Sequence, residues 1–401
     1  MGFIFYSFFT WRILDIIIAY IAKIYDRYEE HFIYKYILYK YTHQIPHFLV
    51  SFANYDGAHY LYIARFGYHQ YEQAFFPFYP LLIRLISPVF GASYFLSGLF
   101  LANISFLVGL YLFKEYLKDI GKNQKTIAWI FLFLLTFPTS FFFGALYTEG
   151  LFFLLVAGSL FFMQKKKYLY LAVFCFFAAL TRLMGVFLLF PLFVTLIFEQ
   201  QRLQLIGTTF QDRFHNLYQF VRKNSKPVLV LFAPLVGLFC YTSYLLLVTH
   251  DPLSFYHGLA AFHTGRSTTH FILLPQVYYR YIHIFSNSSH NVAYYVAVLE
   301  FIVFNLFFLV LLYDLWFLWK KSKEKARMSL IGLNIFSLIN LLLPTFTGTL
   351  TSVPRYALFS LSFFLRLSGI KNIFVKITLL ILFLIFHVLL LTFFIQGFFI
   401  S

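Results

Sequence analysis

Charged residues are scarce in this sequence of 401 residues, since Asp, Glu, Lys and Arg together make up only 11% of it. A soluble domain needs more charge than this to cover its surface, so water is excluded as the solvent for most of the chain. Hydrophobic residues account for 61%, and apolar runs of roughly 18 or more residues recur throughout, each long enough to cross a bilayer as a helix. The alternating segments of a membrane barrel are absent, and lipid cannot satisfy unpaired backbone groups. We therefore predict an all-α polytopic integral membrane protein.

Cysteine is nearly absent as well. Cys175 and Cys240 both fall in apolar runs, which argues against a disulfide framework and against a cysteine metal site. No small-residue cleavage site follows the N-terminal apolar run, and the sequence after Met1-Gly2 lacks the Ser or Thr required for N-myristoylation. We expect the first run to be a retained membrane span.

Acidic residues number 15 against 31 basic ones, which gives a formal net charge of +16. The basic residues form short clusters between the apolar runs, which is typical of loops retained in the cytoplasm. We expect these clusters to set the topology and to attract anionic membrane lipids, and we expect no nucleic-acid partner.

The apolar runs predict about eleven transmembrane helices within one domain, residues 1–401. They cover residues 3–23, 92–113, 126–143, 150–163, 168–180, 186–198, 227–248, 292–319, 329–343, 356–367 and 373–399. Basic clusters follow every second run, which places the N-terminus in the cytoplasm. The opposite face receives a first external loop, about residues 25–91, with interfacial helices, and a second, about residues 250–290. We expect a multi-pass protein of the plasma membrane in a prokaryote, or of the endoplasmic reticulum in a eukaryote. No internal repeat of the two-halves kind is visible.

Arg12 and Asp15 lie three residues apart inside the first apolar run. On a helix they share a face and can neutralise each other, which lowers the free-energy cost of burying them. Two interpretations stay open here, a structural pair and a lining of a substrate groove.

Asp56 is the candidate general base, in a loop with an unusual density of polar residues next to the first span. It is flanked by Tyr55, Gly57 and Tyr60, so it can lie in a partly dry pocket that raises the pKa of its carboxyl. Gly57 would allow a substrate to approach the backbone closely. The alternative is that Asp56 caps a helix over residues 57–66.

Arg182 and Arg355 are the candidate ligands of a phosphate, because each lies where an external loop meets a span. Arginine binds phosphate with paired hydrogen bonds and a permanent charge. The alternative for each is an arginine whose side chain extends to the membrane interface.

Histidines in the second external loop raise the question of a metal site. His257, His263 and His270 lack the four-residue helical spacing of a typical zinc site, and no Asp-x-Asp pair accompanies Asp56. We expect no metal and no cofactor.

Four motifs between residues 54 and 356 resemble, in the same order, those of the PIG-V-type mannosyltransferases, which are GT-C-class membrane glycosyltransferases. The first comprises Tyr55-Asp56-Gly57, His59-Tyr60, Gly67-Tyr68 and Ala74-Phe75-Phe76-Pro77-Phe78-Tyr79-Pro80. The others are Tyr147-Thr148-Glu149, Leu180-Thr181-Arg182-Leu183-Met184-Gly185 and Ser352-Val353-Pro354-Arg355-Tyr356. One departure is Tyr55, where the family usually has Trp.

The resemblance implies a GT-C-type helical bundle that transfers mannose from polyprenyl-phosphate-mannose, with inversion, at the non-cytoplasmic face. It leaves the acceptor open, since a hydroxyl of a lipid-linked glycan, a glycolipid or a protein would fit. It implies Asp56 as the base and Arg182 and Arg355 as ligands of the donor phosphate. We expect further substrate contacts from Tyr55, His59, Tyr60, Glu149, His263 and Arg266. Two other functions stay open, a lipid or polysaccharide transporter and a non-catalytic subunit of a glycosylation complex.

Overall fold

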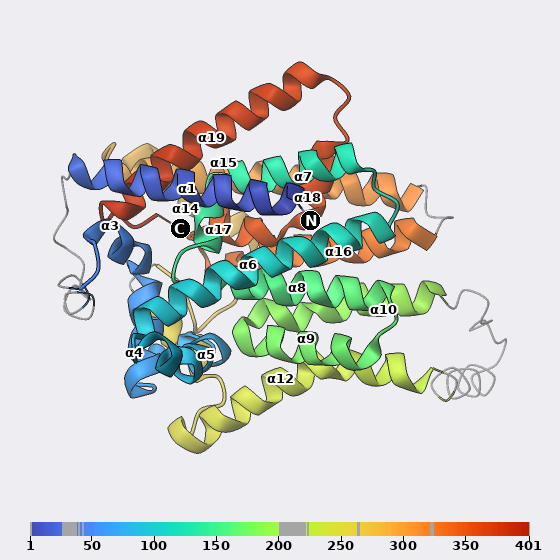
Figure 1. The fold of residues 1–401 in the computed structure, drawn as a ribbon, viewed down its shortest axis with the longest axis horizontal. Coiled ribbons are helices and arrows are strands. Elements are labelled where there is room, and N and C mark those ends of the chain that lie inside the picture. Colours follow the sequence, from blue (N-terminus) through green and yellow to red (C-terminus); the bar gives the residue numbers. More distant parts are fainter. Residues whose placement is uncertain are drawn as a thin grey trace.

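The structure is a computed structural model that describes residues 2–25, 38, 41, 44–199, 222, 224–262, 265–320 and 325–400. Within these ranges it contains 17 α-helices, several short 3₁₀ helices and no strands, which confirms the all-helical prediction. Most of the long helices run along the long axis of the molecule, and the chain reverses direction from one to the next (Figure 1).

Six helices of the described chain are long and apolar enough to cross a membrane, as expected for a multi-pass membrane protein. Five are α1 (Gly2–Ile24), α6 (Tyr94–Asp119), α12 (Ser225–Thr249), α15 (Val292–Lys320) and α19 (Ile373–Ile395). The sixth, Ser329–Thr347, combines most of α16 (Lys325–Leu342) with the 3₁₀ turn that follows it.

The other predicted spans form shorter helices: α7 (Gln124–Thr136), α8 (Glu149–Gln164), α9 (Tyr168–Thr181), α10 (Leu189–Glu199) and α18 (Leu361–Ser368). The prediction of one continuous helix over residues 356–367 is wrong, because the chain breaks at Ser360. The break is stabilised by α16: the Ser360 hydroxyl donates to the Ser337 carbonyl at 2.9 Å, and the Ser362 N–H donates to the Ser337 hydroxyl at 3.2 Å. The Ser362 N–H, a backbone donor at the break, therefore finds a partner inside the protein.

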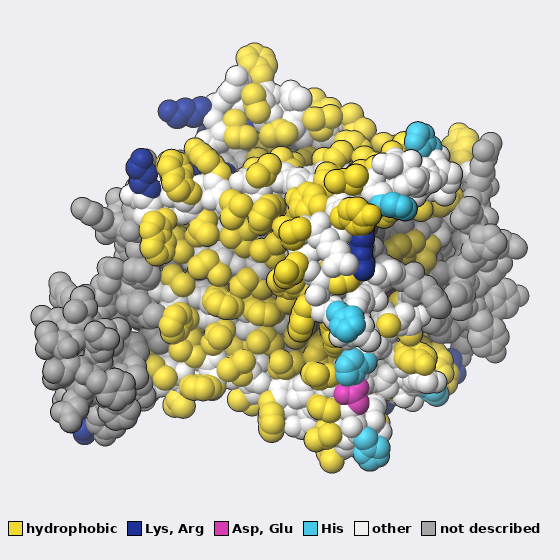
Figure 2. All heavy atoms as spheres, turned by 180° about the vertical axis from the view of Figure 1, so that it is seen from behind, with side chains coloured by type: hydrophobic (Ala, Val, Ile, Leu, Met, Phe, Trp, Pro, Cys, Tyr) yellow, Lys and Arg dark blue, Asp and Glu magenta, His cyan; other side chains and the backbone are white. Residues whose placement is uncertain are grey.

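The two ends of the bundle carry different side chains. One end, here called the histidine end, carries α4 (Asp56–Phe66), α5 (Phe78–Ile86), α13 (Ser254–His257), α14 (Leu274–Asn287) and α17 (Val353–Tyr356). The opposite end carries the connections after α6, α8 and α18 (Figure 1). Figure 2 shows a broad hydrophobic band between an edge with Lys and Arg side chains and an edge with His side chains. This separation matches the distribution of basic and histidine-bearing loops in the sequence.

The described part of residues 25–91, the segment predicted to be the first external loop, folds into short helices. In α5, Tyr79 and Ile83 are buried, whereas Leu81 and Leu85 are exposed. An apolar face left open at the edge of the hydrophobic band is the property expected of an interfacial helix.

Gly57 in α4 packs against the chain just before α8, not against open space. A Cβ atom at Gly57 would lie 3.0 Å from the carbonyl oxygen of Leu146. The Leu146 N–H donates to the carbonyl of Phe52 at 3.0 Å, which fixes this approach. The expectation that Gly57 admits a substrate is therefore wrong, because the protein's own backbone fills that space.

The Arg12–Asp15 pair of α1 is structural. Both side chains are buried, with 3.7 Å between Nη1 of Arg12 and Oδ2 of Asp15. Oδ1 of Asp15 lies 2.7 Å from Nε2 of His387 in α19, and Nδ1 of His387 lies 3.1 Å from the hydroxyl of Ser140. Asp15 is fully enclosed by protein, so the interpretation as a groove lining is wrong.

Candidate functional site

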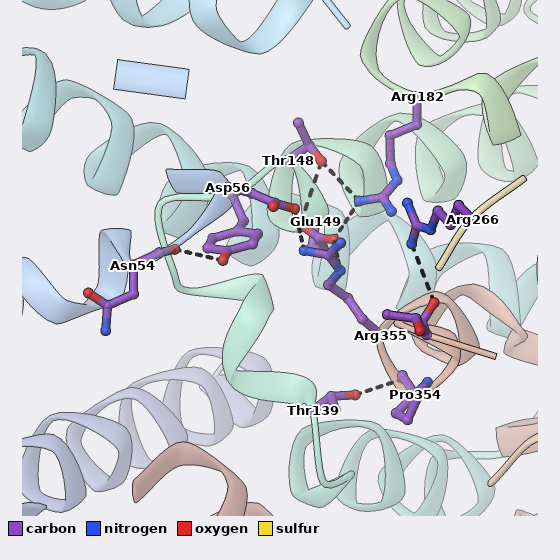
Figure 3. A network of polar contacts seen from close by, with 11 residues as sticks. Asn54, Asp56, Thr139, Thr148, Glu149, Arg182, Arg266, Pro354 and Arg355 are labelled. Carbon is purple, nitrogen blue, oxygen red and sulfur yellow. Dashed lines mark hydrogen bonds and ion pairs between the residues drawn. The ribbon is translucent and has the colours of Figure 1, made fainter. Parts of the chain in front are cut away.

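Segments far apart in the sequence bring three arginines and two carboxylates together at the histidine end. Asp56 begins α4, Glu149 begins α8, Arg182 follows α9, and Arg355 lies in α17. Arg266 comes from the connection between α13 and α14. The three guanidinium groups and two carboxylates point toward a common space (Figure 3). We call these five residues the arginine–carboxylate cluster.

Asp56 and Arg355 form the most direct contact of the cluster, with 2.6 Å between Oδ2 of Asp56 and Nη1 of Arg355. The helix expected after Asp56 is present as α4, but the Asp56 side chain makes no capping hydrogen bond. The capping interpretation is therefore wrong, because the carboxylate is directed to Arg355 instead. It keeps 27% of its side-chain surface exposed, so a small group can still reach it.

The pKa of Asp56 lies below its ordinary value. Burial alone raises it, but the charge of Arg355 and its hydrogen bond, helped by the charges of His59 and Arg266, outweigh burial. The prediction of a raised pKa is therefore wrong, because the sequence does not reveal the arginine partner. Asp56 is an ionised proton acceptor at neutral pH, and its contact with Arg355 reduces its basicity.

Tyr55 fixes the entry of the chain into α4. Its backbone has φ 57° and ψ −116°, a region that side-chain-bearing residues rarely occupy, and its hydroxyl donates to the carbonyl of Gly397. The hydroxyl of Tyr147 donates to the carbonyl of Asn54 at 2.7 Å on the other side of the same turn. Asp56 is thus held in position through its two preceding residues.

Glu149 joins the two predicted phosphate ligands. Its carboxylate is fully buried, accepts a short hydrogen bond from Nη1 of Arg182, and lies 3.5 Å from Nε of Arg355. A Cβ atom at Gly150 would lie 2.3 Å from the carbonyl oxygen of Ala102, so only glycine allows α8 to begin this close to α6. The Glu149 carboxylate thus lies between the guanidinium groups of Arg182 and Arg355.

Both arginines are enclosed by aromatic rings. The guanidinium carbon of Arg182 lies 5.2 Å from the ring centre of Tyr356, and that of Arg355 lies 5.4 Å from the ring centre of Tyr147. Only 12% of the Arg182 side chain and 9% of the Arg355 side chain are exposed. The alternative of arginines that extend to the membrane interface is therefore wrong, because their charges are directed inward to carboxylates and rings.

The turn that carries Arg355 is held by Glu300 of α15, a residue that belongs to none of the motifs in the sequence. One carboxylate oxygen of Glu300 accepts from the Ser352 N–H at 3.1 Å, and the other accepts from the Tyr281 hydroxyl at 2.8 Å. Ser352 has φ 71°, so this hydrogen bond supports a strained residue three positions before Arg355. The available signal was a carboxylate inside an apolar span, which needs buried partners.

Four other residues were predicted to contact the substrate, and the structure places three of them. Arg266 joins the cluster and also donates from Nη2 to the carbonyl of Thr351 at 3.4 Å. Tyr60 is buried, and burial followed by the charge of Asp56 raises the pKa of its hydroxyl. His59 is buried one turn after Asp56, with 3.4 Å between its Nδ1 and Oε1 of Glu72. His263 lies outside the described residues.

Metal ligands do not gather in the part of the chain that the structure describes, where no group of three or more His, Cys, Asp and Glu could hold an ion. His257 instead pairs with Asp251 on the surface, with 2.7 Å between Nδ1 and Oδ2.

The cluster can bind one anionic group, because three guanidinium groups face two carboxylates and leave one positive charge in excess. An ionised carboxylate lies next to that position. In comparisons with known proteins, no family model, no curated protein and no solved structure matches this chain.

Proposed function

We propose that this protein is a membrane glycosyltransferase that transfers mannose from a polyprenyl-phosphate donor to an acceptor hydroxyl, with inversion at the anomeric carbon. The observation that carries the proposal is the contact between Asp56 and Arg355 within a cluster of three arginines at one end of an apolar helical bundle. Such a cluster joins a proton acceptor and an anion site in one place.

The motifs that resemble the PIG-V-type mannosyltransferases also support the proposal. Each of the four contributes one member of the cluster, Asp56, Glu149, Arg182 or Arg355, although they span 299 residues of sequence. Direct contact among residues from all four motifs is expected if the motifs form one site.

The proposed reaction needs one base and one anion site. The hydroxyl oxygen of the acceptor bonds to the anomeric carbon of the sugar, and Asp56 accepts the proton that this hydroxyl loses. The bond from that carbon to the phosphate oxygen breaks, and its electron pair stays on the phosphate. Arg355 and Arg182 stabilise the charge that develops there. The excess of one positive charge suits a phosphodiester, which carries a single negative charge.

The proposed setting is a GT-C-type bundle of about eleven membrane passes, in which the shorter helices complete the set of long ones. The histidine end would face away from the cytoplasm, in the plasma membrane of a prokaryote or the endoplasmic reticulum of a eukaryote. The polyprenyl chain would stay in the lipid.

A non-catalytic subunit remains the second candidate, and the ion pairing within the cluster favours it. A network in which both carboxylates already hold arginines can also serve only to join α4, α8 and α17. A transporter is less well supported, because Asp56 and Glu149 begin helices and Arg182 directly follows one, so these charged groups lie at helix ends and not within long apolar helices.

The test is transfer of label from radiolabelled polyprenyl-phosphate-mannose to a lipid or glycan acceptor by the purified protein. We expect transfer by the wild type and by Asp251→Asn, which neutralises an exposed carboxylate of the same end outside the cluster. We expect none by Asp56→Asn. Equal transfer by Asp56→Asn would remove Asp56 from the mechanism, and no transfer by any form would favour the subunit.

A further inference from the structure

We propose that the ion pair between Asp56 and Arg355 is a lock that the donor phosphate opens, so that the donor must bind before Asp56 can act as a base. This inference rests on the proposed function and adds an order of events to it. The anion replaces the Asp56 carboxylate on Arg355, and the released carboxylate then lies beside the bound donor.

The guanidinium group of Arg355 is engaged on two sides before any substrate arrives. Nη1 donates to Asp56 at 2.6 Å, and Nε faces Glu149 at 3.5 Å without a hydrogen bond. An incoming phosphate that binds Arg355 through two hydrogen bonds must therefore compete with a carboxylate that already holds this side chain.

Asp56 is the partner that can leave. Glu149 is fully buried, is shared by two arginines, and begins a helix packed tightly through Gly150. Asp56 is also the more exposed partner of the pair, with 27% of its side-chain surface accessible against 9% for Arg355.

Arg355 is the partner that stays. Its turn is fixed on one side by the Ser352 N–H bond to Glu300. On the other side, the Thr139 hydroxyl donates to the carbonyl of Pro354 at 2.8 Å. A rotation of the short Asp56 side chain is therefore the smallest movement that frees the guanidinium group.

Release changes what Asp56 can do. Paired with Arg355, the carboxylate gains little by accepting a proton, because protonation would break a charged contact. Once a phosphate neutralises Arg355, that loss disappears, and Asp56 becomes a better proton acceptor only when a donor is present. An acceptor that arrives first would meet a carboxylate still held by Arg355.

Competition of this kind predicts that the Asp56 carboxylate weakens anion binding. The experiment measures equilibrium binding of radiolabelled polyprenyl phosphate, which has no sugar to transfer, to the purified protein in lipid nanodiscs. We expect Asp56→Asn to bind about tenfold more tightly than the wild type, a typical size for coupling between two sites. Asp56→Ala gives the same readout if the amide variant does not fold.

The matched control is Glu72→Gln, which also removes a carboxylate of the first external loop but one that contacts His59 and not an arginine of the cluster. We expect this variant to bind within about twofold of the wild type, because its charge has no direct contact with Arg355. Asp56→Glu, which keeps the charge, should stay closer to the wild type than Asp56→Asn.

Two negative results have different meanings. If Asp56→Asn and Asp56→Ala bind polyprenyl phosphate no more tightly than the wild type, the lock is overturned while the donor assignment stands. If neither the wild type nor any variant binds polyprenyl phosphate, which the proposed transfer releases, the anion site assigned to the cluster is wrong, and the lock is overturned with it.

Discussion

Nε2 of His387 lies 2.7 Å from Oδ1 of Asp15, and this contact joins α19, the last long helix of the chain, to α1, the first. Neither side chain has exposed surface, and Oδ2 of Asp15 has no hydrogen-bond partner in the structure. The stability of the bundle therefore depends on a polar contact that is enclosed on all sides.

His387→Leu is expected to lower the stability of the protein by about 2 kcal/mol, because it removes a hydrogen-bond partner of the buried Asp15 carboxylate and leaves it with only Arg12 at 3.7 Å. The measurement is thermal unfolding in detergent. Thr392→Val is the control on the same helix, since its hydroxyl bonds only to the carbonyl of Val388, and a similar loss in both variants would contradict the prediction.

Arg182→Lys is expected to weaken binding of the donor by about tenfold with little loss of folded protein. Lysine keeps the charge beside Glu149 but loses the planar group that faces the Tyr356 ring and can hold two phosphate oxygens. The check is the donor concentration at half-maximal transfer. An unchanged value would show that Arg182 does not touch the donor.

Glu300→Ala is expected to reduce both donor binding and transfer, because the Ser352 N–H and the Tyr281 hydroxyl lose their acceptor and the turn before Arg355 is released. Glu300→Gln should recover part of the loss, since its amide oxygen can still accept one hydrogen bond. Equal defects in the two variants would argue that the charge of Glu300 matters more than its hydrogen bonds.

The contribution of Asp56 to stability is expected to depend on pH in one direction. A carboxyl whose pKa is lower in the folded protein stabilises it fully above the unfolded value, about 3.9, and loses that contribution as the pH falls through the folded value. Wild type and Asp56→Asn should therefore differ in thermal stability from pH 5 to pH 8, begin to converge only below about pH 4, and converge fully once the pH is below the lowered pKa of Asp56. A difference that grows at acidic pH would contradict the lowered pKa.

The helices and the principal charged residues could be predicted from the sequence because each depends on local information. Apolar runs of the right length locate α1, α6, α12 and α15, and ionisable residues at the edges of such runs pointed to Arg182 and Arg355. The pairing of Asp56 with Arg355 is a contact between residues 299 positions apart, and no local pattern encodes it. The direction of the Asp56 pKa depends on that contact, so it could not be predicted either.

Some structurally important residues were visible in the sequence, but their roles were ambiguous. Glu300 and His387 stand out as polar residues inside apolar spans, yet their partners Ser352 and Asp15 come from other segments. The missing side chain of Gly57 was expected to leave space for a substrate, whereas the carbonyl of Leu146 occupies that space. A glycine shows that something approaches the backbone closely, without showing what.

Glu149 has a consequence for how the two neighbouring arginines can be studied. The buried carboxylate of Glu149 contacts both Arg182 and Arg355. If either arginine is replaced by alanine, Glu149 interacts with the other arginine alone. Each single deletion therefore alters the strength of the surviving arginine, and the loss from both together will not equal the sum of the separate losses. The contribution of each arginine to phosphate binding can therefore be defined only together with that of the other.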